Sequence, residues 1–109
     1  MEVSCFKTVE LIKEFFKAIN LKIEKFFLFG SQARGDNNIN SDYDFLIVLN
    51  KDLKFREKRK LKTSLNKYLQ SNNALLDMDL ILKSIDVWEW ESNNIGFLSY
   101  IVKQEGIEL

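Results

Sequence analysis

The fold of this chain is decided by two neighbouring segments, Gly30-Ser31-Gln32-Ala33-Arg34-Gly35-Asp36 and Ser41-Asp42-Tyr43-Asp44-Phe45-Leu46-Ile47-Val48. The first follows an apolar run, Lys25–Phe29, that ends at a glycine, which favours a buried strand followed by a sharp turn. The second passes from acidic residues into an apolar body over Asp42–Leu49, which predicts another strand. The polar residues between the two strands predict a loop, with a short helix over Ser31–Arg34.

Apolar periodicity on either side of these segments predicts further helices and one more strand. We expect helices over Phe6–Ile19, stopped by Asn20, and over Phe55–Gln70, and a strand over Ala74–Leu82. In the tail we expect helices over Ile85–Trp90 and Ile95–Lys103, with Gly106 stopping the second. The end of the chain is either a short terminal strand or a loose end. This order predicts an α/β (α+β) fold in a single domain, 1–109.

Composition excludes several kinds of chemistry. The 109 residues include no histidine and one cysteine, so this chain supplies no histidine base, no His-ligated zinc and no internal disulfide. Sixteen basic and sixteen acidic residues balance, which argues against direct nucleic-acid binding through a general basic surface and leaves only a local patch open. Without a long apolar run or a signal-peptide pattern, we expect a cytoplasmic protein that does not enter membranes. Cys5 is expected to be a spectator near a frayed terminus.

The Gly30-Ser31 pair suits an anion. A glycine at a strand end lets a phosphate approach the backbone, and a serine at the start of a helix offers a hydroxyl and N–H groups. Arg34 follows one turn later, where its guanidinium could reach a phosphate oxygen. Taken alone, the pair is better explained by a serine helix cap with a surface arginine, which is the commoner case.

Asp42 and Asp44 lie two residues apart at the start of a strand, so both carboxylates point to the same side. A divalent cation relieves the repulsion between two such anions, and oxygen ligands favour Mg²⁺ or Mn²⁺. The alternative is a solvated turn. Asp77 and Asp79 also share one side of the next strand, and either could complete a three-carboxylate cluster. We favour Asp79 because it lies closer to the apolar body, although both could simply face solvent.

Together these residues carry a family resemblance. Gly30-Ser31, ten residues and Asp42-Tyr43-Asp44 resemble the GSx10DxD signature of the DNA polymerase β-type nucleotidyltransferase superfamily. The wider string GSQARGDNNINSDYDFLIVL is similar to its minimal branch, which includes the MntA-type antitoxins paired with HepT (HEPN) toxins. Gln32 departs from the pattern, because many relatives carry a basic residue there.

The resemblance implies a small mixed β-sheet flanked by helices, with the site at one end of the sheet, and a role for each matched residue. Gly30 and Ser31 would hold the phosphates of ATP, with Arg34 beside them, and Asp42, Asp44 and Asp79 would bind two Mg²⁺ ions. Asp79 would also position or deprotonate the acceptor hydroxyl. The family chemistry would be AMP transfer to a tyrosine of a HEPN toxin, which silences it. Because the catalytic core uses up 109 residues, we expect a partner protein to supply much of the acceptor site.

Three further readings stay open. The basic stretch from Lys51 to Lys62 could meet RNA or an acidic partner, although the solvated face of a helix is the simpler account. Trp88 and Trp90 are two residues apart, so on a helix they cannot both face one core, and an exposed tryptophan would suit an interface. As alternatives to protein modification, the chain could neutralise a toxin by contact alone or transfer a nucleotide to a small molecule.

Overall fold

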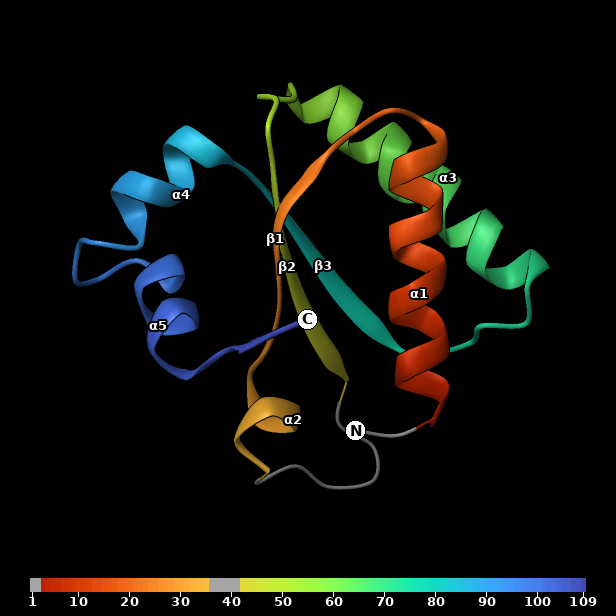
Figure 1. Ribbon diagram of the computed structural model, residues 1–109, viewed down its shortest axis with the longest axis horizontal. Coiled ribbons are helices and arrows are strands. Elements are labelled where there is room, and N and C mark those ends of the chain that lie inside the picture. The colour runs from red at the N-terminus through yellow and green to blue at the C-terminus, as the bar shows by residue number, and fades with distance from the viewer. Residues whose placement is uncertain (1–2, 36–41) are drawn as a thin grey trace.

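The computed structural model describes residues 3–35 and 42–109 (Figure 1). In these residues helices and strands follow one another in the order that the sequence predicts, with a short strand at the end. The elements are α1 (Val3–Ala18), β1 (Ile23–Phe29), α2 (Ser31–Arg34), β2 (Tyr43–Leu49), α3 (Phe55–Ser71), β3 (Met78–Ser84), α4 (Ile85–Glu91), α5 (Leu98–Glu105) and β4 (Ile107–Glu108).

The strands form one mixed sheet in the order β3-β2-β1-β4. β1 runs antiparallel to β2 and to β4, whereas β2 and β3 are parallel and are connected through α3. Figure 1 shows α1 and α3 on one side of the sheet and α4 and α5 on the other. The expected α/β class, a small mixed sheet flanked by helices, is confirmed.

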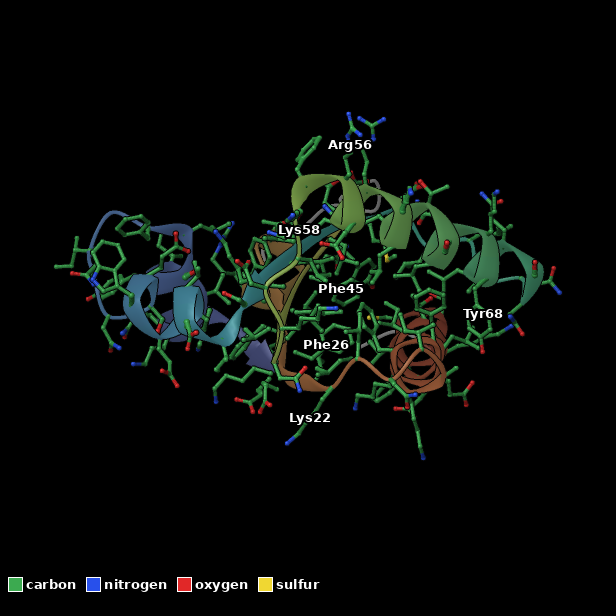
Figure 2. The ribbon with its side chains drawn as sticks, turned by 90° about the horizontal axis from the view of Figure 1, so that it is seen from above. Lys22, Phe26, Phe45, Arg56, Lys58 and Tyr68 are labelled. Atoms are coloured by element: carbon green, nitrogen blue, oxygen red, sulfur yellow. The ribbon has the colours of Figure 1, made fainter. Side chains whose placement is uncertain are left out.

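Alternation along the two central strands explains why both sides of the sheet are covered. Phe26, Phe45 and Ile47 face a core that α1 and α3 close, and Figure 2 shows Phe26 and Phe45 between these helices. The Phe26 and Phe45 rings meet edge to face with their centroids 5.5 Å apart. The intervening residues of the same strands, Leu46 and Val48 among them, face a second core under α4 and α5. A strand buried on both faces reads as a continuous apolar run, which is the pattern of Phe45–Leu49.

Most expected boundaries are confirmed to within about three residues, and two need correction. β3 begins at Met78 rather than Ala74, because Asn73 takes φ 59° and the Ala74 N–H donates back to the carbonyl of Leu69, which closes α3. α5 begins at Leu98 rather than Ile95, because Gly96 has φ 106° and interrupts the helical path. The short terminal strand, one of two alternatives for the chain end, is the one observed.

The structure corrects the expectation for Cys5 and decides between the alternatives for the two tryptophans. Cys5 is fully buried in the core under α1 rather than near a frayed end, because the helix begins at Val3. α4 is helical, so the two tryptophans face opposite ways: Trp88 is buried, whereas Trp90 is 60% exposed. Within the described residues, no helix is sufficiently long and apolar to cross a membrane.

The tryptophan pair offers a matched test of the second core. Trp88 stacks on Phe27 with ring centroids 5.0 Å apart, so Trp88→Ala should lower the free energy of unfolding by roughly 3–5 kcal/mol. Trp90→Ala removes a mostly exposed ring and should cost about 1 kcal/mol or less. Urea denaturation of both variants measures the difference, and similar losses for the two would contradict the unequal burial of the two rings.

Candidate active site

Three strands bring their site residues into one row at one end of the sheet. Phe29, the last residue of β1, is the register partner of Asp44, and Asp44 is in turn the register partner of Asp79 on β3. Because register partners on adjacent strands point to the same face, the two carboxylates lie side by side. The face is that of Leu46 and Val48, on the side of α4 and α5. The apolar bodies of β2 and β3 fix this register, since a one-residue slip would turn every side chain over.

Gly30 meets Asp44 at the point where β1 turns into α2. Its φ is +75°, a conformation that residues with a side chain rarely adopt. A β-carbon at this position would collide with Oδ2 of Asp44. The backbone of the Gly30-Ser31 turn therefore approaches the carboxylate as closely as it does only because position 30 carries no side chain.

The surroundings of Asp44 disfavour its charge. Burial raises the pKa of the Asp44 carboxyl above its ordinary value, and the negative charges of Asp79 and Asp42 raise this pKa further. The Arg34 guanidinium acts in the opposite direction and lowers it. Three carboxylates thus act on one place, and a positive ligand at this place would relieve their repulsion.

The donor set suits a hard divalent cation, although it is not gathered into a finished metal centre. Asp44 and Asp79 line a common hollow of about 560 Å³, and carboxylate oxygens are the ligands that Mg²⁺ and Mn²⁺ prefer. Asp42 is exposed just before β2. Among residues 3–35 and 42–109, no three acidic or cysteine side chains lie close enough to hold a metal ion together. The residues therefore fit Mg²⁺ by chemistry and by charge, with Asp44 and Asp79 as the adjacent pair.

The other predicted site residues lie around this pair. Ser31 opens α2 and is half-buried, and Arg34 closes α2, where it makes a loose ion pair of 3.8 Å with Glu105 of α5. Asp79, rather than Asp77, lies opposite Asp44. Asp77 precedes β3 and accepts a hydrogen bond at its carbonyl from the Tyr43 N–H, 3.0 Å away. The catalytic and metal-binding roles of these residues stay predictions.

Two residues of α3 that sequence patterns place on a solvated face also line the hollow. Lys62 and Asn66 border it together with Asp44 and Asp79. The sequence held a partial signal for them. Leu61 and Leu65 mark the buried side of α3, and Lys62 and Asn66 directly follow these residues, which places them at the border of that side. Nothing in the sequence, however, shows that this flank of α3 borders the edge strand β3.

Comparison with known proteins agrees with this geometry. The family model described as polymerase beta, nucleotidyltransferase matches residues 10–108. The chain belongs to the polymerase β nucleotidyltransferase family. It is thus a nucleotidyltransferase, and the resemblance seen in the Gly30-Ser31 and Asp42-Tyr43-Asp44 segments is confirmed.

Two further proteins are similar to this nucleotidyltransferase. A protein of Methanocaldococcus jannaschii named "Putative protein adenylyltransferase MJ0141" is 35% identical over 81 residues, which span 71% of this chain and 82% of that protein. A solved structure described as a toxin-antitoxin with AMP-PNP superimposes with a TM-score of 0.54 at 20% identity, over 91% of this chain and 69% of the other. At that identity the second likeness shows a shared fold.

Two glycines at positive φ separate the contact at Asp44 from the general effect of an added methyl group. Gly35 is left-handed (φ 79°, ψ 9°), so Gly35→Ala should lose about 1–2 kcal/mol of stability. Gly30 (φ 75°, ψ −159°) lies in a backbone region that is essentially restricted to glycine, so Gly30→Ala should lose more. Only Gly30→Ala should also displace the Asp44 carboxylate, because nothing lies within 4 Å of a β-carbon at Gly35. Carboxyl-carbon NMR should show a changed Asp44 resonance in Gly30→Ala alone. An unchanged Asp44 signal there would disprove the contact.

The raised pKa of Asp44 predicts a pH-dependent stability. Because folding disfavours the ionised carboxylate, Asp44 destabilises the native state above its folded pKa, and the penalty is relieved as the pH falls through that value towards about 4. Asp44→Asn should therefore raise the melting temperature by a few degrees at pH 7, measured without divalent ions, and the gain should vanish in acid. Asp52→Asn, at the other end of β2, is the control and should show no such gain.

Proposed function

We propose that this nucleotidyltransferase transfers AMP from ATP to a tyrosine hydroxyl of a partner toxin of the HEPN type and thereby acts as its antitoxin. The observation that carries the proposal is the Gly30 backbone turned against Asp44, with Asp79 beside it, in a chain of the polymerase β nucleotidyltransferase family. The name of the Methanocaldococcus relative, a protein adenylyltransferase, supports a protein acceptor and ATP as donor. With ATP as its substrate, the cytoplasm is the compartment we propose.

The chain's own residues would bind and orient the nucleotide. Gly30 leaves room for a phosphate next to the strand end, and the Ser31 hydroxyl at the start of α2 can donate to a phosphate oxygen. Arg34 is about half exposed and could exchange its loose pairing with Glu105 for a phosphate. Without a basic residue at Gln32, Arg34 would be the main cation of this grip.

The carboxylates would hold the metal ions and the proton. Asp42, Asp44 and Asp79 would bind Mg²⁺, or Mn²⁺ in its place, which would neutralise charge on the transferred phosphate and on the leaving pyrophosphate. Asp79 would accept the proton of the acceptor hydroxyl as that oxygen forms its bond to the α-phosphorus. The bond from the α-phosphorus to pyrophosphate breaks in the same transfer, and no histidine is needed.

An exposed apolar surface supports a protein partner. Five large side chains of the α4–α5 region are open to solvent: Val87 (41%), Trp90 (60%), Ile95 (84%), Leu98 (41%) and Ile101 (49%). Exposed apolar residues concentrated in one region commonly mark protein–protein interfaces. α4 and α5 cover the same sheet face to which Asp44 belongs, so a protein bound there would lie on the same side of the sheet as the carboxylates. The toxin-antitoxin neighbour with AMP-PNP has the same fold and is consistent with this arrangement.

Transfer itself is tested with ATP labelled in its α-phosphate, Mg²⁺ and the protein encoded beside this one. Wild type should label that protein on tyrosine, and Asp44→Asn should be slower by roughly 10²–10³-fold, because it removes one of the carboxylates that would hold Mg²⁺ at the reacting phosphate. Asp52→Asn should label at the wild-type rate. Equal labelling by wild type and Asp44→Asn, or none by either, contradicts the proposal.

The same apolar surface favours a second candidate, neutralisation of the toxin by contact alone. The double variant Asp42→Asn, Asp44→Asn separates the two functions, because it leaves the α4–α5 surface intact. If growth in the presence of the toxin is rescued by this variant as well as by wild type, contact is sufficient. If rescue is lost while the complex still forms, transfer is required.

A further inference from the structure

The balanced net charge of the chain conceals a concentrated basic surface on α3. Half of the sixteen Lys and Arg residues and only two of the sixteen acidic residues lie between positions 51 and 67. The eight basic residues are Lys51, Lys54, Arg56, Lys58, Arg59, Lys60, Lys62 and Lys67. The rest of the chain is correspondingly acidic. Six of the eight belong to the single helix α3, so the charge lies along one rod.

These cations are not used to hold the fold together. None of the eight forms a salt bridge with a residue of the described parts of the chain, where the ion pairs involve Lys13, Lys22, Arg34 and Lys83 instead. Arg56, Arg59 and Lys60 are exposed, and Figure 2 shows Arg56 pointing away from the sheet. Like charges at three- and four-residue spacing destabilise a helix by a few tenths of a kcal/mol per pair. A stability role does not account for the cluster.

A shallow hollow on this surface combines cations, hydroxyls and an aromatic ring. It measures about 660 Å³ and is lined by Phe55, Arg56, Arg59, Lys60, Thr63 and Ser64. Phe55 is 74% exposed, although it is a large apolar residue at the start of a helix, and the Arg59 guanidinium lies 5.9 Å from its ring centroid. The ring is thus held at the surface with a cation over it, ready for a flat group to stack on.

We propose that this surface of α3 binds a single-stranded nucleic acid, with a base stacked on Phe55 and phosphates held by Arg56, Arg59 and Lys60. Nucleic-acid interfaces are far more positive than protein–protein interfaces, in which lysine is depleted. Single-strand binding surfaces pair a cationic track with exposed aromatic rings, because every base has a face to stack. An acidic protein could also use the exposed Phe55 ring as an apolar anchor, but the concentration of lysine around it favours a nucleic acid.

The surface continues towards the carboxylates. Phe55, Arg59, Lys62 and Asn66 are separated by four, three and four residues, so they lie along one side of α3. Lys62 and Asn66 border the hollow that holds Asp44 and Asp79. A strand bound at Phe55 and followed along this side therefore runs towards the edge of β3. The inference does not depend on the proposed acceptor, because none of the α3 residues is assigned to the transfer.

Fluorescence anisotropy tests the proposal with labelled oligouridylate and oligothymidylate of about 12 nucleotides, a duplex of equal length and poly-L-glutamate, over a range of KCl concentrations. Both single strands should bind more tightly than the duplex and the polyglutamate, and the tighter of the two identifies the natural strand. Phe55→Ala should weaken binding about tenfold, and Phe55→Trp should retain it. Arg56→Gln with Arg59→Gln should weaken binding and flatten its dependence on log salt by about 0.7 for each phosphate that the variant no longer neutralises.

The control is Lys7→Gln with Lys17→Gln, which removes the same charge from exposed positions of α1. It should leave binding nearly unchanged, and melting curves verify that all variants are folded. The absence of binding at low salt overturns the proposal, as does an equal loss in the control variant. Polyglutamate that binds as tightly as the oligonucleotides would instead assign the surface to an acidic protein. A Phe55→Ala variant that binds normally would disprove the stacking of a base on Phe55.

Discussion

The parallel pairing of β2 with β3 is the constraint on which the site depends. It places Asp44 directly beside Asp79, and burial together with the negative charge of Asp79 raises the pKa of Asp44. Two carboxylates held in this way are tolerated because the apolar residues that follow them, Phe45–Leu49 on β2 and Leu80–Leu82 on β3, are packed and fix the register. The stability of the strand bodies thus maintains an unfavourable arrangement at the strand ends.

The two-sided burial of the sheet is what makes that register rigid. Phe26 and Phe45 pack under α1 and α3, and Phe27 and Trp88 stack on the other side. Shifting β2 by one residue would turn its side chains to the opposite faces of the sheet. The residues of both cores would then lose their packing partners, and Asp44 would move away from Gly30. The close approach of the Gly30 backbone to Asp44 is therefore a property of the whole sheet, and the missing side chain at Gly30 only makes it sterically possible.

Local patterns in the sequence predict most of this arrangement. β1, α2 and β2 follow from an apolar run, a glycine and an Asp-led strand, and the family resemblance to the nucleotidyltransferases rests on the same residues. The predicted starts of β3 and α5 are wrong because the backbone angle of a single residue, Asn73 or Gly96, sets each boundary. Propensity cannot show that a particular residue adopts positive φ. The sequence could not predict the burial of Cys5 or the position of Lys62 beside the hollow, because both depend on how helices cross the sheet.

The separation of charge within a neutral chain follows from the same architecture. Asp44 and Asp79 belong to the face covered by α4 and α5, whereas the basic residues lie on α3, which covers the opposite face. The two charge regions meet where Lys62 and Asn66 border the hollow at the edge of β3. Carboxylates repel a negatively charged nucleotide until cations neutralise them. Arg34 lowers the pKa of Asp44, and Lys62 lines the same hollow as Asp44 and Asp79, so both basic side chains lie near the carboxylates. The edge of β3, rather than either face alone, is therefore where the carboxylates of the strand ends and the cations of α3 come together.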